Sequence, residues 1–160
     1  MEKSKSEKVK LDHIVIDGKD MILGRLCTFA AKQTLLGKKV DVINCDDIIV
    51  TGKRQTIIMK YKSRLHRGDV FKGPFISRST DRLTRRTIRG MLPFKNARGK
   101  DVFSNVMCYK TTPESLKDKK PIHLKNAHVS KLSEINYMTM KELSKLIWKQ
   151  SILLEKEKGQ

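Results

Sequence analysis

The first fifty residues alternate short apolar runs with one helical repeat. Residues 13–18 (HIVIDG) have the pattern of a short buried strand that ends in a turn. Between 24 and 36 the apolar positions recur at helical spacing, and Gly37 follows where a helix typically ends. Residues 40–44 predict a second strand, and 48–51 predict a third. A strand, a helix and a strand within about 30 residues indicate a βαβ unit, whose strands lie parallel.

Two amphipathic helices with basic faces are predicted in the middle of the chain. In residues 53–65, apolar side chains recur on one side, and lysines and arginines occupy the other. Residues 66–79 contain two glycines, one proline and two phenylalanines without a helical period, which is typical of a loop. In the helix predicted at 81–92, the apolar residues, including Met91, point mostly away from an arc about 100° wide that holds four arginines. Those arginines are Arg82, Arg85, Arg86 and Arg89.

Fewer elements are predicted in the C-terminal third. Apolar positions within 99–109 favour another helix, and residues 122–124 favour a short strand. Thr139 and Glu142 have the spacing of a capping box, so a helix is expected to begin there and run towards Glu157.

Positive charge is concentrated in the middle third of the chain. The whole sequence carries a formal net charge of +18 at pH 7. Residues 53–100 contain 15 lysines and arginines but only two acidic residues, Asp69 and Asp81. Such a field favours a polyanionic partner, and nucleic acid is the natural one because neutralising its phosphates releases counterions. The alternative is a merely soluble surface, but such surfaces usually mix both signs of charge.

Sequence motifs of catalysis, metal binding and cofactor binding are absent. No GxGxxG, GxSxG or HExxH occurs, and the stretch 47–54 lacks the first glycine and the Ser/Thr of a phosphate loop. The three cysteines form no CxxC pair, and the four histidines have no metal-ligand spacing. Asp46 and Asp47 are adjacent and suit a turn or cap better than acid–base catalysis. We therefore expect a reduced, intracellular protein with no enzyme activity, cofactor, metal site or small-molecule substrate.

Several separate motifs, in the same order, resemble one protein family. Residues 88–93 (IRGMLP), followed by 99–100, Val106 and Tyr109, resemble the signature of the universal large-subunit ribosomal protein thirteen family. The stretches IDGKDMILGRLCTFAAK, VINCDDIIVTGKR and GPFISRSTDRLTRRTIRGMLP agree with it. The GPF and RGMLP motifs look like the archaeal/eukaryotic branch, and residues 137–149 are similar to the eukaryotic cytosolic form.

This resemblance implies a fold, partners and a location. The implied fold is α/β, with three α/β/α layers around a parallel sheet of about four strands, plus basic loops and a C-terminal helix. The implied partners are large-subunit rRNA and neighbouring large-subunit ribosomal proteins, in cytosolic ribosomes that assemble in the nucleus or nucleolus. The expected organisation is a loose lead-in at 1–12, an α/β rRNA-binding domain at 13–131 and a C-terminal helical extension at 132–160.

The mechanistic hypothesis is a clamp for RNA phosphates within the basic region at 53–100. The helix at 53–65 with its loop forms one surface, and the arginine stripe forms the other. Phe71, Phe75 and Phe94 have two interpretations, which are stacking on splayed bases or anchoring of loops to the core. The candidate RNA-binding residues are Lys53, Arg54, Lys60, Lys62, Arg64, His66, Arg67, Lys72, Arg78, Arg82, Arg85, Arg86, Arg89, Lys95, Arg98 and Lys100.

Three other functions fit part of the sequence. An extra-ribosomal regulatory RNA-binding protein would present the same surface to a different RNA. A nucleic-acid-processing enzyme would need the clustered carboxylates of a two-metal site, which the sequence lacks. A membrane-surface protein would need an exposed apolar face beside its basic residues, and no apolar run approaches the roughly 20 residues of a membrane span.

Overall fold

The structure is a computed structural model that describes residues 12–69, 71–133 and 136–148. The N-terminal lead-in expected at 1–12 lies outside these ranges except for Asp12. The part of the expected C-terminal helix beyond Trp148 also lies outside them.

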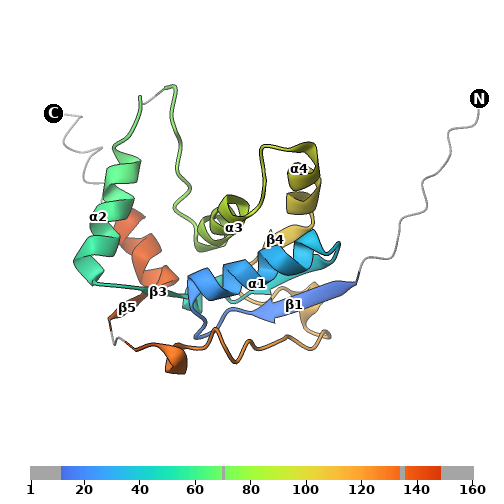
Figure 1. The fold of residues 1–160 in the computed structure, drawn as a ribbon. Helices are drawn as coiled ribbons and strands as arrows, with labels where there is room; N and C mark the ends of the chain where they lie inside the picture. Colours follow the sequence, from blue (N-terminus) through green and yellow to red (C-terminus); the bar gives the residue numbers. More distant parts are fainter. Residues whose placement is uncertain (1–11, 70, 134–135, 149–160) are drawn as a thin grey trace, which may run out of the picture.

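A three-stranded parallel sheet forms the centre of the molecule (Figure 1). Its strands are β1 (His13–Asp17), β2 (Lys39–Ile43) and β4 (Val106–Cys108), in the order β1-β2-β4. Helix α1 (Leu23–Leu35) connects β1 to β2, so the predicted βαβ unit is present. A single parallel bridge between Ile16 and Ile122 extends the sheet beyond β1. The α/β class expected from the sequence is therefore confirmed.

The third predicted strand is present but belongs to a different sheet. Strand β3 (Ile49–Thr51) pairs antiparallel with β5 (Tyr137–Thr139), with Ile49 opposite Thr139. The short strand expected at 122–124 is reduced to the bridge at Ile122. Pairing of β3 with a segment almost ninety residues away is set by tertiary packing, which local apolar patterns do not encode.

The prediction of one helix over 99–109 is wrong for the second half of that range. Helix α4 (Ala97–Ser104) ends before β4, and the apolar residues from Val106 to Cys108 belong to this strand. The backbone of β4 completes β2, because Val40 N donates to Asn105 O (3.0 Å) and Tyr109 N donates to Val42 O (2.8 Å). A continuous helix would leave these groups of β2 unpaired inside the protein, so the sheet prevails over the local helical period.

One face of the sheet carries the main hydrophobic core. Val40, Val42 and Val106 point into a cluster that also contains the buried side of α1. Helix α3 (Thr80–Met91) packs against α1 and adds Leu83 and Ile88 to this cluster. The opposite face is covered by a smaller cluster of Val15, Ile43 and Leu116, where Leu116 comes from a short 3-10 helix.

The C-terminal part of the described chain joins the same core. Residues 140–148 are helical, and Met140, Leu143 and Ile147 are buried. Thr139 Oγ1 accepts a hydrogen bond from Glu142 N (3.3 Å), which confirms the helix start expected from the capping box. The remaining elements are α2 (Arg54–Leu65) and 3-10 helices at Cys45–Asp47, Glu114–Leu116 and Val129–Lys131.

Candidate nucleic-acid interface

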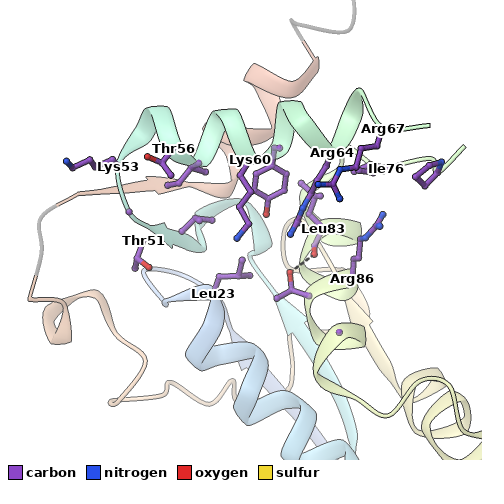
Figure 2. Close-up of a pocket in the computed structure, with 17 residues that line it drawn as sticks. Leu23, Thr51, Lys53, Thr56, Lys60, Arg64, Arg67, Ile76, Leu83 and Arg86 are labelled. Carbon is purple, nitrogen blue, oxygen red and sulfur yellow. Dashed lines mark hydrogen bonds between the residues drawn. The ribbon is translucent and has the colours of Figure 1, made fainter. Parts of the chain in front are cut away.

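A groove of about 730 Å³ lies between α2 and α3, and positively charged side chains line it. Figure 2 shows Lys60 and Arg64 of α2 and Arg86 of α3 projecting into the space between the two helices. Pro74 and Ile76, from the loop between the helices, also line it, while no Asp or Glu does so among the described residues. We call this site the α2–α3 groove; its cations are Lys53, Lys60, Arg64, Arg67 and Arg86.

The groove follows from the way α2 sits on the core. Gly52 has a φ of +121°, a backbone conformation that favours glycine, and it turns the chain from β3 into α2. Ile57 is the buried residue of α2, whereas Tyr61 is half-buried. Four of the groove cations, at positions 53, 60, 64 and 67, recur at intervals of seven, four and three residues, which places them along one side of the helical segment. The predicted basic helix is confirmed, and Lys60 and Arg64 from its charged side line the groove.

The arginine stripe predicted on α3 divides into three environments. Arg86 lines the α2–α3 groove. Arg85 and Arg89 lie instead over aromatic rings, with guanidinium carbons 4.7 Å from the Phe103 centroid and 3.9 Å from the Phe94 centroid. Arg82 is exposed and lines a separate hollow of about 580 Å³. The four arginines therefore do not form one contact surface. They lie in three different places around α3.

The aromatic pair under these arginines favours the anchoring interpretation of Phe94. Phe94 and Phe103 meet edge to face, with centroids 5.4 Å apart and planes at 89°. Phe94 is half-buried, so it anchors the α3–α4 connection and supports Arg89. Arg85 Nε is buried and has no hydrogen-bond partner within the part of the chain that the structure describes. Met91, one of the apolar residues expected to point away from the stripe, is 40% exposed, whereas Leu83 and Ile88 are buried.

The loop at 66–79 presents two aromatic side chains to solvent. Backbone hydrogen bonds between Asp69 and Gly73, with N–O distances of 3.1 and 3.0 Å, close a tight turn in this loop. Phe71 is 89% exposed and Phe75 is 74% exposed, so neither anchors the loop to the core. Gly68 has a φ of +92°, and a Cβ there would lie 2.1 Å from Gly73 O, so the turn requires glycine at this position.

The other candidate residues lie outside the α2–α3 groove. Arg78 shares the hollow beside Arg82, and its guanidinium lies 5.2 Å from the centroid of the Trp148 ring. The rest are exposed, except for half-buried Lys62, and none of them lines the groove: Arg54, Lys62, His66, Lys72, Lys95, Arg98 and Lys100.

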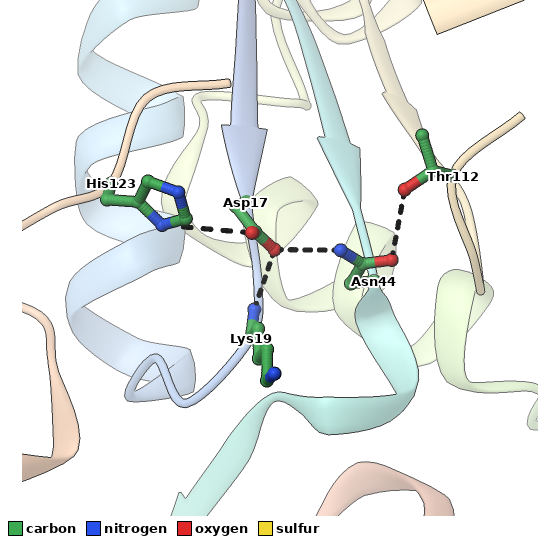
Figure 3. Close-up of polar contacts among 5 residues, drawn as sticks. All are labelled: Asp17, Lys19, Asn44, Thr112 and His123. Carbon is green, nitrogen blue, oxygen red and sulfur yellow. Dashed lines mark hydrogen bonds and ion pairs between the residues drawn. The ribbon is translucent and has the colours of Figure 1, made fainter. Parts of the chain in front are cut away.

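The acidic residues near the site serve the fold. Asp46 lies in the 3-10 turn Cys45–Asp47, as the turn role expected for it predicts. Its Oδ1 accepts a hydrogen bond from Thr80 Oγ1 (2.5 Å), which joins this turn to the first residue of α3. Asp17 is buried at the end of β1 and accepts hydrogen bonds from Lys19 N (3.0 Å) and Asn44 Nδ2 (2.9 Å) (Figure 3). His123 Nδ1 lies 3.7 Å from Asp17 Oδ2. This network joins distant segments, and it could not be predicted from the sequence because its members are widely separated along the chain.

The cysteines also lack a catalytic environment. Burial raises the pKa of the Cys27 thiol, and a hydrogen bond with Cys45 together with burial raises the pKa of Cys108. Raised pKa values favour the unreactive thiol over the nucleophilic thiolate. Among the described residues, no group of three or more His, Cys, Asp or Glu is arranged to hold a metal ion. In the same ranges, no helix has the length and apolar character needed to span a bilayer.

Taken together, the fold and the groove define an α/β protein with a positively charged groove on its surface. A family model described as ribosomal protein L13 matches residues 11–115. "Large ribosomal subunit protein uL13" of Methanopyrus kandleri is 39% identical over 132 residues, covering 81% of this chain and 83% of that protein. The proteins of the same name from Methanosarcina barkeri (38%, covering 81% and 94%) and Archaeoglobus fulgidus (34%, covering 85% and 88%) are also similar. The chain therefore belongs to the ribosomal protein L13 family.

The family confirms the resemblance drawn from the sequence motifs. The three relatives are archaeal, which agrees with the archaeal/eukaryotic branch indicated by the GPF and RGMLP motifs. The eukaryotic cytosolic type, inferred from residues 137–149, stays a prediction.

Proposed function

We propose that this chain is a structural constituent of the large ribosomal subunit and that it holds large-subunit rRNA both in the α2–α3 groove and on the adjoining arginines of α3, which are Arg82, Arg85 and Arg89. The names of its relatives support the large-subunit role. The observation that carries the RNA-binding role is the groove itself, which five cations line and in which no carboxylate balances them among the described residues. The chain acts by binding and positioning RNA, without catalysis.

The electrostatics of the groove favour phosphate as its ligand. Lys60 and Arg64 are four residues apart on α2, and a like-charge pair at this spacing destabilises a helix by about 0.2–0.5 kcal/mol. Arg86 brings a further positive charge from α3 into the same space. A phosphate chain between the helices reverses the sign of these interactions and releases its condensed counterions. The guanidinium groups suit this ligand because their planar fork can contact two phosphate oxygens at once.

The two exposed phenylalanines of the loop extend the site towards unpaired nucleotides. Phe71 and Phe75 lie on either side of Lys72 in the sequence, so aromatic side chains and a cation occur together in the same loop. Duplex RNA hides its base edges in a deep major groove, whereas splayed bases can stack on aromatic rings. We assign Phe71 and Phe75 to base stacking, which is worth about 1–3 kcal/mol per base.

The proposed organisation places the rRNA-binding domain at 13–131 and a helical extension at 132–160. Within the described residues, the extension supplies β5 and buried Met140, Leu143 and Ile147 to the core of the domain. The extension therefore stabilises the α/β domain that positions α2 and α3 on either side of the groove. The partners are large-subunit rRNA and neighbouring ribosomal proteins in cytosolic ribosomes, and by fixing distant RNA segments the chain supports subunit assembly in the nucleus or nucleolus.

The salt dependence of RNA binding tests the role of the groove. If about eight phosphates are engaged, log K falls with log salt at a slope of roughly −6 to −7. Replacing Lys60, Arg64, Arg67 and Arg86 by Gln should flatten this slope by about 3 for a large-subunit rRNA fragment. The matched control replaces four exposed lysines away from the groove with Gln and changes the net charge equally: Lys117, Lys120, Lys141 and Lys145. Equal slopes for the two variants would contradict the proposed site.

Sedimentation of cell extracts tests the ribosomal role separately. The chain should be present stoichiometrically in large-subunit particles and stay there at moderate salt. Recovery only in light fractions would favour the extra-ribosomal regulatory RNA-binding protein, which presents the same surface to a different RNA.

A further inference from the structure

A second group of cations gathers around α1, on segments that the sequence did not connect. One hollow of about 840 Å³ is lined by Arg25 and Lys32 of α1 and by His123 and Lys125 of the segment that follows β4. An adjoining hollow of about 600 Å³ shares His123 and Lys125. It adds three further basic side chains, which are Lys19, His128 and Lys131.

Helix α1 presents this surface because its two sides differ in polarity. Leu26 and Ala30 belong to the side that is buried in the core. Arg25, Thr28 and Lys32 are exposed and recur at intervals of three and four residues, so they share the outward side. The outward side of α1 is therefore polar and open to solvent.

The segment that faces α1 is held firmly in place. Arg25 Nη1 donates to Asn126 O (3.0 Å), and Ile22 N donates to Ala127 O (2.8 Å). Val129 N donates to Asp20 O (3.0 Å), which fixes the far end of the segment to the turn before α1. Arg25 uses few of its five N–H donors on Asn126, so the remaining donors stay available to a ligand. The cations of this surface are thus carried on an ordered framework.

Charge and position both point to the same kind of ligand. Among the described residues, no carboxylate lines the larger hollow, and Asp20 is the acidic residue that lines the smaller one. The larger hollow also shares Thr51 with the α2–α3 groove, so the two sites meet at the end of β3. A polyanion that leaves the groove past Thr51 would meet a second row of positive charge.

We infer that this second basic surface, defined by Lys19, Arg25, Lys32, Lys125 and Lys131 with His123 and His128, is a second contact for the RNA phosphate backbone. The inference rests on the proposed RNA-binding role and extends it to the other side of α1. The protein then holds RNA on two surfaces that share one boundary, at Thr51. Shape and charge, without base readout, determine binding here, because phosphates carry no sequence information.

The test compares three variants of the full chain that each lose four positive charges. The first replaces Lys19, Lys32, Lys125 and Lys131 with Gln and leaves Arg25 in place to preserve its bond to Asn126. The second is the groove variant, and the third is the control with Lys117, Lys120, Lys141 and Lys145 replaced. Each binds the same large-subunit rRNA fragment over a range of salt concentrations, and circular dichroism checks that each is folded.

The second-surface variant should flatten the salt slope by about 3, as the groove variant does, since each lost phosphate contact contributes roughly 0.7–0.9 to the slope. A slope equal to that of the control would overturn the second surface, while a flattened slope in the groove variant would leave the proposed function intact. If neither variant differs from the control, both proposals fail. Unchanged rRNA binding together with crosslinks from Lys32 or Lys125 to an acidic protein segment in assembled particles would assign this surface to a protein partner and overturn the inference.

Discussion

Helices α2 and α3 carry similar positive charge but are held in the molecule in different ways. Thr80, Leu83, Thr84 and Ile88 of α3 are buried, whereas Ile57 is the buried residue of α2. Arg85 and Arg89 of α3 lie over rings that come from outside their helix, with guanidinium carbons 4.7 and 3.9 Å from the ring centroids. Arg64 of α2 lies 5.6 Å from the ring centroid of Tyr61, which belongs to its own helix. The difference shows that α3 contributes side chains to the core and has two arginines oriented by aromatic rings. Helix α2 contributes less to the core and mainly places positive charge in the groove.

Core truncation should separate the two helices most strongly. Ile88→Ala removes a fully buried side chain of α3 and should lower the free energy of unfolding by about 2–5 kcal/mol. Ile58→Ala removes a half-buried side chain of the same type from α2 and should cost less than half as much. Urea unfolding at fixed pH measures both, and equal losses would show that α2 is as much a part of the core as α3.

Charge removal should affect RNA affinity more when it is made on α3. Orienting a side chain on binding costs about 0.5–1.5 kcal/mol, and the rings under Arg85 and Arg89 reduce this cost before RNA arrives. The α3 variant should therefore bind rRNA about tenfold more weakly than the α2 variant, although each loses four charges. The α3 variant replaces Arg82, Arg85, Arg86 and Arg89 with Gln, and the α2 variant replaces Lys53, Lys60, Arg64 and Arg67.

Both variants should flatten the salt slope to a similar degree, because the slope counts phosphates and not their orientation. Filter binding at several salt concentrations gives the affinity and the slope together. A weaker effect of the α3 variant on affinity would contradict the orienting role of the rings.

The exposed loop aromatics should contribute to binding without contributing to stability. Phe71→Ala should weaken binding of an rRNA fragment with unpaired bases by about 1–3 kcal/mol, because a stacked base loses its platform. The midpoint of urea unfolding should not change, since Phe71 is 89% exposed. Phe71→Trp is the matched control and should retain binding. A lower midpoint of urea unfolding with unchanged affinity for rRNA would show that Phe71 supports the fold and does not stack on bases.

Replacing the ring beneath Arg89 should have a smaller effect. Phe94→Leu keeps an apolar side chain beside Phe103 but removes the ring face under the guanidinium, so it should weaken RNA binding by about 1 kcal/mol. The salt slope should stay unchanged because the number of contacted phosphates is the same. A flattened slope would indicate that Phe94 supports more of the surface than Arg89.

Thiol labelling gives the mildest test of how well α3 covers the core. Burial raises the pKa of Cys27, so the folded protein holds less thiolate there at pH 8 than an exposed cysteine does. Cys27 should therefore react with iodoacetamide far more slowly in the folded protein than in urea. Ile88→Ala should increase the rate in the folded state, and Ile58→Ala should leave it near the parent value. Rapid labelling of the folded parent protein would show that the core around Cys27 opens readily.

The local elements could be predicted from the sequence where one periodicity dominated. The strand at 13–17, the helix that ends at Leu35 and the arginine-rich helix at 80–91 all follow apolar repeats that packing then confirms. The stretch at 105–109 could not be assigned in this way, because Val106 fits a helical repeat and a buried strand equally well. The residues from Val106 to Cys108 form a strand because they pair with the edge of β2 that β1 does not cover.

The composition of the site was partly visible in the sequence, but its arrangement was not. The charge excess at 53–100 identified all five cations of the α2–α3 groove. It did not distinguish Arg86, which faces the groove, from Arg85, which lies over Phe103. The cations around α1 were missed because Lys32 and Lys125 are far apart in the chain and neither lies in a basic run. Charge density along a sequence thus finds a surface only when one segment supplies most of it.

Protein–RNA crosslinking in assembled large ribosomal subunits tests the central claim most directly. Peptides that contain Lys60, Arg64, Arg67 or Arg86 should crosslink to rRNA at high yield, and these crosslinks should disappear in the groove variant. Crosslinks that arise elsewhere, with these four side chains facing water or acidic protein, would contradict the assignment of the α2–α3 groove to RNA.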